Sequence, residues 1–185
     1  MTETFVPKYE LISADDPILR EEQELFDFAN PPTDPIELAH DMVQHMMYYN
    51  GIGLAAPQLG LPYRVFAIRA KPNLVCFNPY VTDFTSDEEK IEEGCLTFPN
   101  LFMKVKRPKA IKVRYTEPNG NTQNQTFTGL TARIFLHELD HLDGVLFIDR
   151  VSDLTLNMAK KKAKKYNRGY DFSKVDPFLL DNLTK

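Results

Sequence analysis

The motif HELDH at residues 137–141 constrains this chain more than any other stretch. Residues four apart lie on one face of an α-helix, so both imidazoles can reach a single cation. Glu138 follows the first histidine and can reach a water on that cation. The flanking positions are mostly apolar, so we predict a largely buried helix from about residue 130 to 142, ended by Gly144.

Two histidines leave a catalytic zinc-type site one protein ligand short. No histidine follows residue 141, and His40 and His45 lie far upstream in no comparable motif. Cys95 is the better candidate, because Gly94 before it lets other backbone approach and Pro99 holds the following loop. The alternative is that Cys95 is a small buried apolar residue, which is how we interpret Cys76.

A third stretch, GIGLAAPQ at residues 51–58, combines two glycines, two alanines and a glutamine. The small residues leave space for a partner backbone, and Gln58 offers an amide donor. Taken alone, the stretch is equally compatible with a tight helix-to-strand connection.

The remaining pattern predicts an α+β domain with mostly antiparallel sheets packed around the metal-binding helix. Apolar residues at three- and four-residue spacing predict an N-terminal helix over residues 36–50, and a polar C-terminal helix over 154–166. Pro118-Asn119-Gly120-Asn121 predicts a hairpin turn. β-type runs indicate strands at residues 64–69, 74–78, 80–84, 102–106, 110–116 and 122–127.

Composition narrows the function classes. A length of 185 residues fits one domain, and a net charge of −4 argues against DNA binding. Two cysteines imply no disulfide framework, and the N-terminal residues resemble neither a secretory signal nor a transit peptide. No apolar run reaches membrane-spanning length. We therefore expect a cytoplasmic protein without a membrane partner.

Together, three motifs resemble those of the peptide deformylase family, which has a GxGxAAxQ loop, an EGCLS-like loop and an HExDH helix. Here they read GIGLAAPQ, EGCLTFP and HELDH in the same order, and DPILR at residues 16–20 is similar to an N-terminal family segment. The resemblance covers a motif-bearing core of about residues 15–150 within a single domain of residues 1–185. The C-terminal helix and tail, residues 151–185, match no motif.

The resemblance implies the roles of the central residues. Cys95, His137 and His141 would bind one divalent ion, expected to be Fe²⁺ in the cell, with Zn²⁺, Ni²⁺ or Co²⁺ as alternatives. The implied reaction hydrolyses the N-formyl group of the initiator methionine of nascent peptides and releases formate. Glu138 would act as acid and base, while the Gln58 amide and the Leu96 N–H would stabilise the oxyanion.

The substrate site follows from the same resemblance. An extended peptide would lie beside Ile52, with close approach allowed by Gly53 and Gly94. The methionine slot would be walled by Gly51, Leu96, Leu130, Ile134 and the His137 ring, with Phe102 and Arg133 nearer the rim. A pair between Glu93 and Arg107 would brace the loop that carries Cys95. Thr97 and Phe102 depart from residues common in the family.

Other interpretations remain. A zincin-type peptidase shares the helix motif but takes its third ligand downstream, and a non-catalytic binding module would need a fourth protein ligand. The lysine cluster at residues 160–165 is typical of a solvated helix face. Some family members contact the ribosome through a C-terminal helix, so a weak ribosome contact is the alternative for this cluster.

Overall fold

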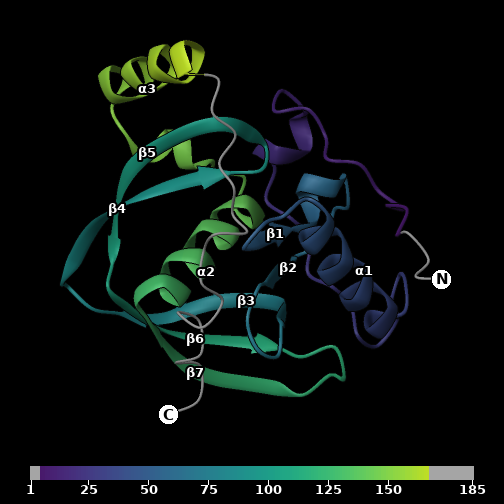
Figure 1. The fold of residues 1–185 in the computed structure, drawn as a ribbon. Coiled ribbons are helices and arrows are strands. Elements are labelled where there is room, and N and C mark those ends of the chain that lie inside the picture. The colour runs from purple at the N-terminus through teal and green to yellow at the C-terminus, as the bar shows by residue number, and fades with distance from the viewer. Residues whose placement is uncertain (1–4, 167–185) are drawn as a thin grey trace.

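A computed structural model describes residues 5–166 of the chain. Two antiparallel sheets enclose a central helix (Figure 1). The larger sheet has the order β1-β2-β3-β6-β7, and the smaller pairs β4 with β5. The strands are β1 (Gly53–Ala55), β2 (Val65–Ile68), β3 (Leu74–Phe84), β4 (Glu88–Cys95), β5 (Phe98–Pro108), β6 (Ala110–Thr116) and β7 (Thr122–Thr128).

Three α-helices accompany the sheets: α1 (Pro35–Tyr48), α2 (Gly129–Leu142) and α3 (Asp153–Tyr166). Short 3₁₀ helices are η1 (Pro17–Arg20), η2 (Ala56–Leu59) and η3 (Phe147–Arg150). The predicted α+β class and the predicted helices are confirmed, with α1 starting where Asp34 accepts hydrogen bonds from two backbone amides. No described helix is long and apolar enough to cross a membrane.

The large sheet is covered on both faces, which explains why every residue of β2 is buried. Phe66 and Ile68 face α2 and join one apolar cluster, whereas Val65 and Ala67 face α1 and join another. This alternation is what the two-residue period of a strand requires. The α2 helix is thereby held between the large sheet and the β4–β5 ribbon (Figure 1).

Some strands differ from the sequence-based prediction. The two runs predicted at 74–78 and 80–84 form one strand, β3, interrupted by a register shift at Asn78, whose φ is 50°. The segment before Cys95, expected as a loop, is the strand β4, paired with β5 along its whole length. Its many charged residues have low β propensity, so cross-strand pairing rather than intrinsic preference forms it.

Candidate metal centre

The α2 helix carries the histidine motif through the centre of the molecule. Eleven of its fourteen residues are buried, because a sheet covers it on either side. His137 and His141 are 7% and 1% exposed, so the motif lies in the interior as the sequence predicts.

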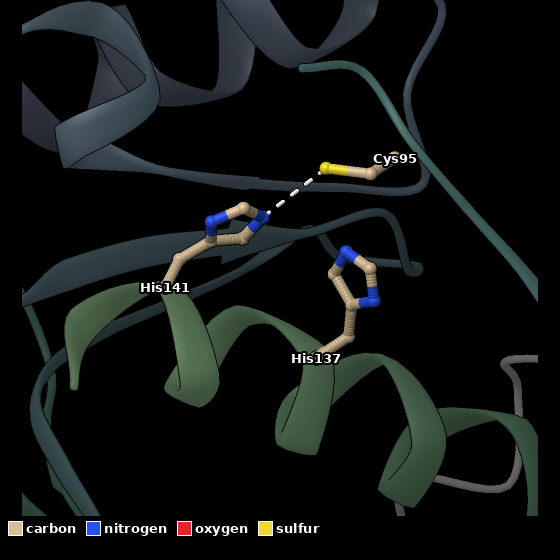
Figure 2. Close-up of side chains that lie close together, drawn as sticks. All are labelled: Cys95, His137 and His141. Atoms are coloured by element: carbon tan, nitrogen blue, oxygen red, sulfur yellow. Dashed lines mark hydrogen bonds between the residues drawn. The ribbon is translucent and has the colours of Figure 1, made fainter. Parts of the chain in front are cut away.

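Three donor atoms converge above this helix (Figure 2). Cys95, at the end of β4, directs its Sγ toward α2, where it lies 3.2 Å from Nε2 of His141. The ligand atoms of Cys95, His137 and His141 all lie within 4.8 Å of one another, and all three residues are buried. One thiolate and two imidazoles suit zinc, ferrous iron, nickel and cobalt. This geometry and donor set therefore fit one such cation.

The surroundings of Cys95 favour the thiolate form of its side chain. Burial alone would raise its pKa, but the neighbouring imidazoles of His141 and His137 hold that pKa well below its usual value. A thiolate is the form that binds metal. Cys76, in contrast, lies fully buried in an apolar cluster, as expected for a core residue, and this burial raises the pKa of its thiol well above its usual value.

Glu93 organises the surroundings of His137. Its carboxylate accepts hydrogen bonds from Nε of Arg107 at 2.7 Å and Nη2 of Arg107 at 3.0 Å, and from Nη1 of Arg133 at 2.9 Å. It also contacts Nδ1 of His137 at 3.0 Å. A proton on Nδ1 leaves Nε2 of His137 free to bind a cation. The predicted pair of Glu93 and Arg107 is therefore present.

Glu138 is the buried carboxyl group beside the donor cluster. Burial raises its pKa to about 7, against the opposing effect of the His137 and His141 imidazoles. Its Oε2 has no hydrogen-bond partner in the described part of the chain. A Cβ at Gly53 would lie 2.2 Å from Oε1 of Glu138, so β1 approaches this carboxyl group as only a glycine allows. The carboxyl group is thus placed to exchange a proton with a bound molecule.

Gln58 connects the η2 segment to the Cys95 loop. Its Oε1 accepts the backbone N–H of Ala55 at 2.8 Å, which fixes the amide orientation. Its Nε2 then points at Thr97 Oγ1, 3.0 Å away, and at Cys95 Sγ, 3.6 Å away. The amide donor therefore faces the donor cluster.

A cavity of about 240 Å³ opens beside the site. The walls of this cavity are mostly apolar, and His137 and Glu138 line the part nearest the donor cluster. Its lining includes Ile52, Ile91, Gly94, Phe102, Leu130 and Ile134. A second, smaller recess lies at the donor cluster itself. The other residues predicted to contact the substrate or to stabilise the oxyanion line it, together with donor-cluster residues and Glu138: Gly51, Gly53, Gln58, Cys95, Leu96, His137 and Glu138.

The structure places two residues of this cavity, Arg133 and Phe102, differently from the sequence-based expectation. Arg133 lines it but is not a rim residue: it is 5% exposed, and its guanidinium is held by Glu93 and by the backbone carbonyls of Val105 and Glu89. Phe102 packs directly on Gly94, where an added Cβ would lie 2.3 Å from the ring. Gly94 is therefore needed for packing of the Phe102 ring, a constraint that the sequence did not indicate.

Two residues of the surrounding ion-pair network were missed from the sequence. Asp140 is a buried carboxylate paired with Arg107, and Arg150 pairs with Asp140 from η3. Asp140 could have been noticed as an acid on a helix predicted to be largely buried, because a buried acid requires a cationic partner. No sequence pattern pointed to Arg150.

Comparison with known proteins agrees with this geometry. The model of the polypeptide deformylase family matches residues 8–157. A peptide deformylase of Synechocystis sp. is 41% identical to this chain over 147 residues, which cover 76% of each protein. A peptide deformylase of Thermotoga petrophila is 40% identical over 152 residues, which cover 80% of this chain and 89% of the relative. The crystal structure of a Synechococcus elongatus peptide deformylase in complex with actinonin superposes with a TM-score of 0.79 at 37% identity, covering 86% of this chain and 87% of that one. The chain belongs to the polypeptide deformylase family, whose members remove the N-formyl group from nascent polypeptides.

Proposed function

We propose that Cys95, His137 and His141 bind one divalent cation, beside which the formyl amide of an N-formylmethionyl peptide is hydrolysed. The observation that carries the proposal is the convergence of three buried donor atoms within 4.8 Å, next to a Glu138 carboxyl oxygen that has no hydrogen-bond partner within residues 5–166. Such a cation polarises a carbonyl group and acidifies water. We propose Fe²⁺ as the cellular metal, with Zn²⁺, Ni²⁺ or Co²⁺ as substitutes.

Glu138 would manage the proton of the reaction. A water oxygen adds to the formyl carbon, the C–N bond breaks, and the products are formate and the free amine of methionine. The Glu138 carboxylate accepts a proton from the attacking water and delivers it to the leaving nitrogen. Its pKa of about 7 suits both directions of transfer at neutral pH.

The oxyanion would be stabilised by the Gln58 side-chain amide and the Leu96 backbone N–H. The fixed orientation of Gln58 supports this role, because its Oε1 is occupied by Ala55 and only the N–H₂ end faces the cluster. Preorganised donors of this kind need no rearrangement during the reaction.

The methionine side chain would occupy the apolar cavity. A volume of about 240 Å³ accommodates an unbranched side chain, and Leu130, Ile134 and Phe102 supply apolar walls. The peptide backbone would lie extended beside Ile52, with Gly53 and Gly94 lining its path. Arg133 would shape this cavity by holding the β4 and β5 backbones rather than by touching the peptide.

Two broader expectations belong to this proposal. We place the reaction in the cytoplasm, where formylated nascent chains are made, within a single catalytic domain. On α3, Lys160, Lys161, Lys162 and Lys164 are exposed, which fits a solvated helix face. A weak ribosome contact through the helix at residues 160–165 is the alternative.

The rival functions lack comparable support. A zincin-type peptidase would not need Cys95 as a ligand, yet the Cys95 thiol lies beside His141. A structural cation in a non-catalytic module would need four protein donors, and the described residues bring three together.

The deciding experiment measures formate release from a short formyl-Met peptide by protein loaded anaerobically with Fe²⁺. Glu138→Gln is the matched variant, because it preserves side-chain volume and all three donors while removing the proton-carrying group. We expect release by the wild type and a loss of about 10²–10⁴-fold in the variant. Stoichiometric metal binding without formate release by the wild type would reject the proposed reaction. Screening for internal peptide cleavage would then test the peptidase.

A further inference from the structure

A series of buried ion pairs runs from the cation site to the chain segment that follows α2. Glu93 links His137 to Arg107, and Arg107 donates through Nη1 to Oδ2 of Asp140 at 2.8 Å. The Arg107 guanidinium therefore lies between two carboxylates. Because each nitrogen has a defined acceptor, a shift of either carboxylate would move the guanidinium.

Arg150 ends this series from a different element, the 3₁₀ helix η3. Its Nε donates to Oδ2 of Asp140 at 3.0 Å and its Nη2 to Oδ1 at 2.5 Å. This is the two-point geometry that arginine forms with a carboxylate. The Asp140 side chain is 8% exposed and that of Arg150 is 46% exposed, so the series reaches solvent at Arg150.

The arrangement leaves each carboxylate little freedom. Asp140 is next to His141 in sequence and one helical turn after His137. Without Arg150, the buried Asp140 would keep Arg107 as its cationic partner, and Arg107 would be shared unequally between Asp140 and Glu93. Removing one partner of a buried ion pair is costly because the remaining charge is left poorly compensated, so closer pairing of Asp140 with Arg107 would be favoured. Arg133 also holds Glu93, through Oε1. The effect on His137 would therefore pass through Oε2 of Glu93, which accepts from Nη2 of Arg107 and contacts Nδ1 of His137.

We propose that Arg150 is a positioning residue for the cation site, acting on His137 through Asp140, Arg107 and Glu93. The Arg150 side chain thereby bears on the geometry of the donors, although the η3 segment that carries it adds no residue to the donor cluster. This inference rests on the proposed binding of a cation by Cys95, His137 and His141.

The test compares Arg150→Gln with Arg20→Gln in full-length protein. Arg20 is a close control, because its side chain is 48% exposed and pairs with Asp149, the neighbour of Arg150 in η3. Co²⁺ is the probe: its absorption spectrum reports ligand geometry, and competition with a chelator reports affinity. Formate release gives kcat and KM separately.

We expect Arg150→Gln to weaken Co²⁺ binding by about tenfold, to shift the cobalt spectrum, and to lower kcat with little change in KM. Arg150→Lys restores the charge but not the two-point contact, so partial recovery is expected. Arg20→Gln should match the wild type in affinity, spectrum and kcat.

Equal spectra and affinities for Arg150→Gln and Arg20→Gln would overturn the proposal. An equal loss of affinity in both variants would also overturn it, because the effect would then reflect general loosening of η3. If the wild type binds Co²⁺ but releases no formate, the proposed reaction fails. The spectral comparison would still decide the role of Arg150.

Discussion

The helices α1 and α2 each bury histidine, but the imidazole nitrogens have different partners. In α1, Nδ1 of His45 contacts the carbonyl of Asp41 at 2.7 Å, and Nε2 accepts the backbone N–H of Tyr9 at 2.9 Å. In α2, Nε2 of His141 faces the Cys95 sulfur, and Nδ1 of His141 has no hydrogen-bond partner among the described residues. Both residues are almost fully buried, so burial alone does not separate them.

The difference shows how a buried histidine is assigned a role. His45 uses both nitrogens on backbone groups and packs against the rings of Phe5 and Tyr9, so it attaches the N-terminal segment to α1. The α2 histidines lie among charged groups and direct nitrogen toward a sulfur. An imidazole whose nitrogens are both occupied by backbone has no capacity left for a cation, whereas one facing a thiolate has.

The largest expected effect comes from removing the charge that orients His137. Glu93→Gln would leave Arg107 and Arg133 partly unpaired in the interior. We expect a loss of about 3–5 kcal/mol in the free energy of unfolding, measured by urea denaturation, together with weaker cation binding. Glu92→Gln changes the exposed neighbour on β4 and should alter neither. A loss below about 1 kcal/mol, the scale of exposed pairs, would contradict the clamping role of Glu93.

The second prediction separates the two cysteines. Cys95→Ser should weaken Co²⁺ binding by at least about 100-fold, because even partners outside the ligand set change affinity by about 10–100-fold. Cys76→Ser should leave Co²⁺ affinity unchanged, since Cys76 is buried in the apolar cluster beneath α2. Chelator competition measures both variants. Similar affinities for Cys95→Ser and the wild type would place the third ligand elsewhere.

The sequence predicted the α2 helix and the grouping of its two histidines well because the signals are local. Two histidines four apart, an adjacent glutamate and an amphipathic pattern all lie within one helix, so period and spacing suffice. The approach of Cys95 to His141 is a long-range contact, and the residues alone left open whether Cys95 was a ligand or a core residue. Resemblance to the family resolved that choice in advance, and the 3.2 Å contact between Sγ and Nε2 agrees with it.

The parts that were not predicted depend on pairing between distant segments. β4 forms because each of its residues is paired across to β5, and nothing in its charged sequence favours a strand. The burial of Arg133 follows from three acceptors on β4 and β5 that come together only in the folded chain. The role of His45 was equally invisible, because its acceptor and donor partners are backbone groups that any sequence possesses.

The third prediction concerns the approach of β1 to α2. Gly53→Ala would place a methyl group 2.2 Å from Oε1 of Glu138, so the carboxyl group must move. We expect formate release to fall by about 10–100-fold with cation affinity unchanged, because displacement of about 1 Å at a reacting group can cost about 100-fold. Gly51→Ala would instead meet the flexible end of Leu96 at 2.9 Å and the carbonyl oxygen of Gly53 at 3.0 Å. Because neither belongs to the Glu138 carboxyl group, a smaller loss is expected there. Equal activity of Gly53→Ala and the wild type would exclude a positional requirement at Glu138.

The smallest effect should come from His45 in α1. Its substitution tests whether a buried histidine with both nitrogens on backbone groups is independent of the cation site. His45→Gln removes the imidazole acceptor of the Tyr9 N–H and the ring against which Phe5 packs. We expect a loss of about 1–3 kcal/mol in the free energy of unfolding, the usual consequence of leaving a buried polar group without its partner. Cation affinity and the cobalt spectrum should not change, because His45 lies on α1, which packs on the opposite face of the sheet from α2. If His45→Gln weakened cobalt binding as Cys95→Ser is expected to, the partners of the ring nitrogens would no longer distinguish a structural histidine from a ligand in this fold.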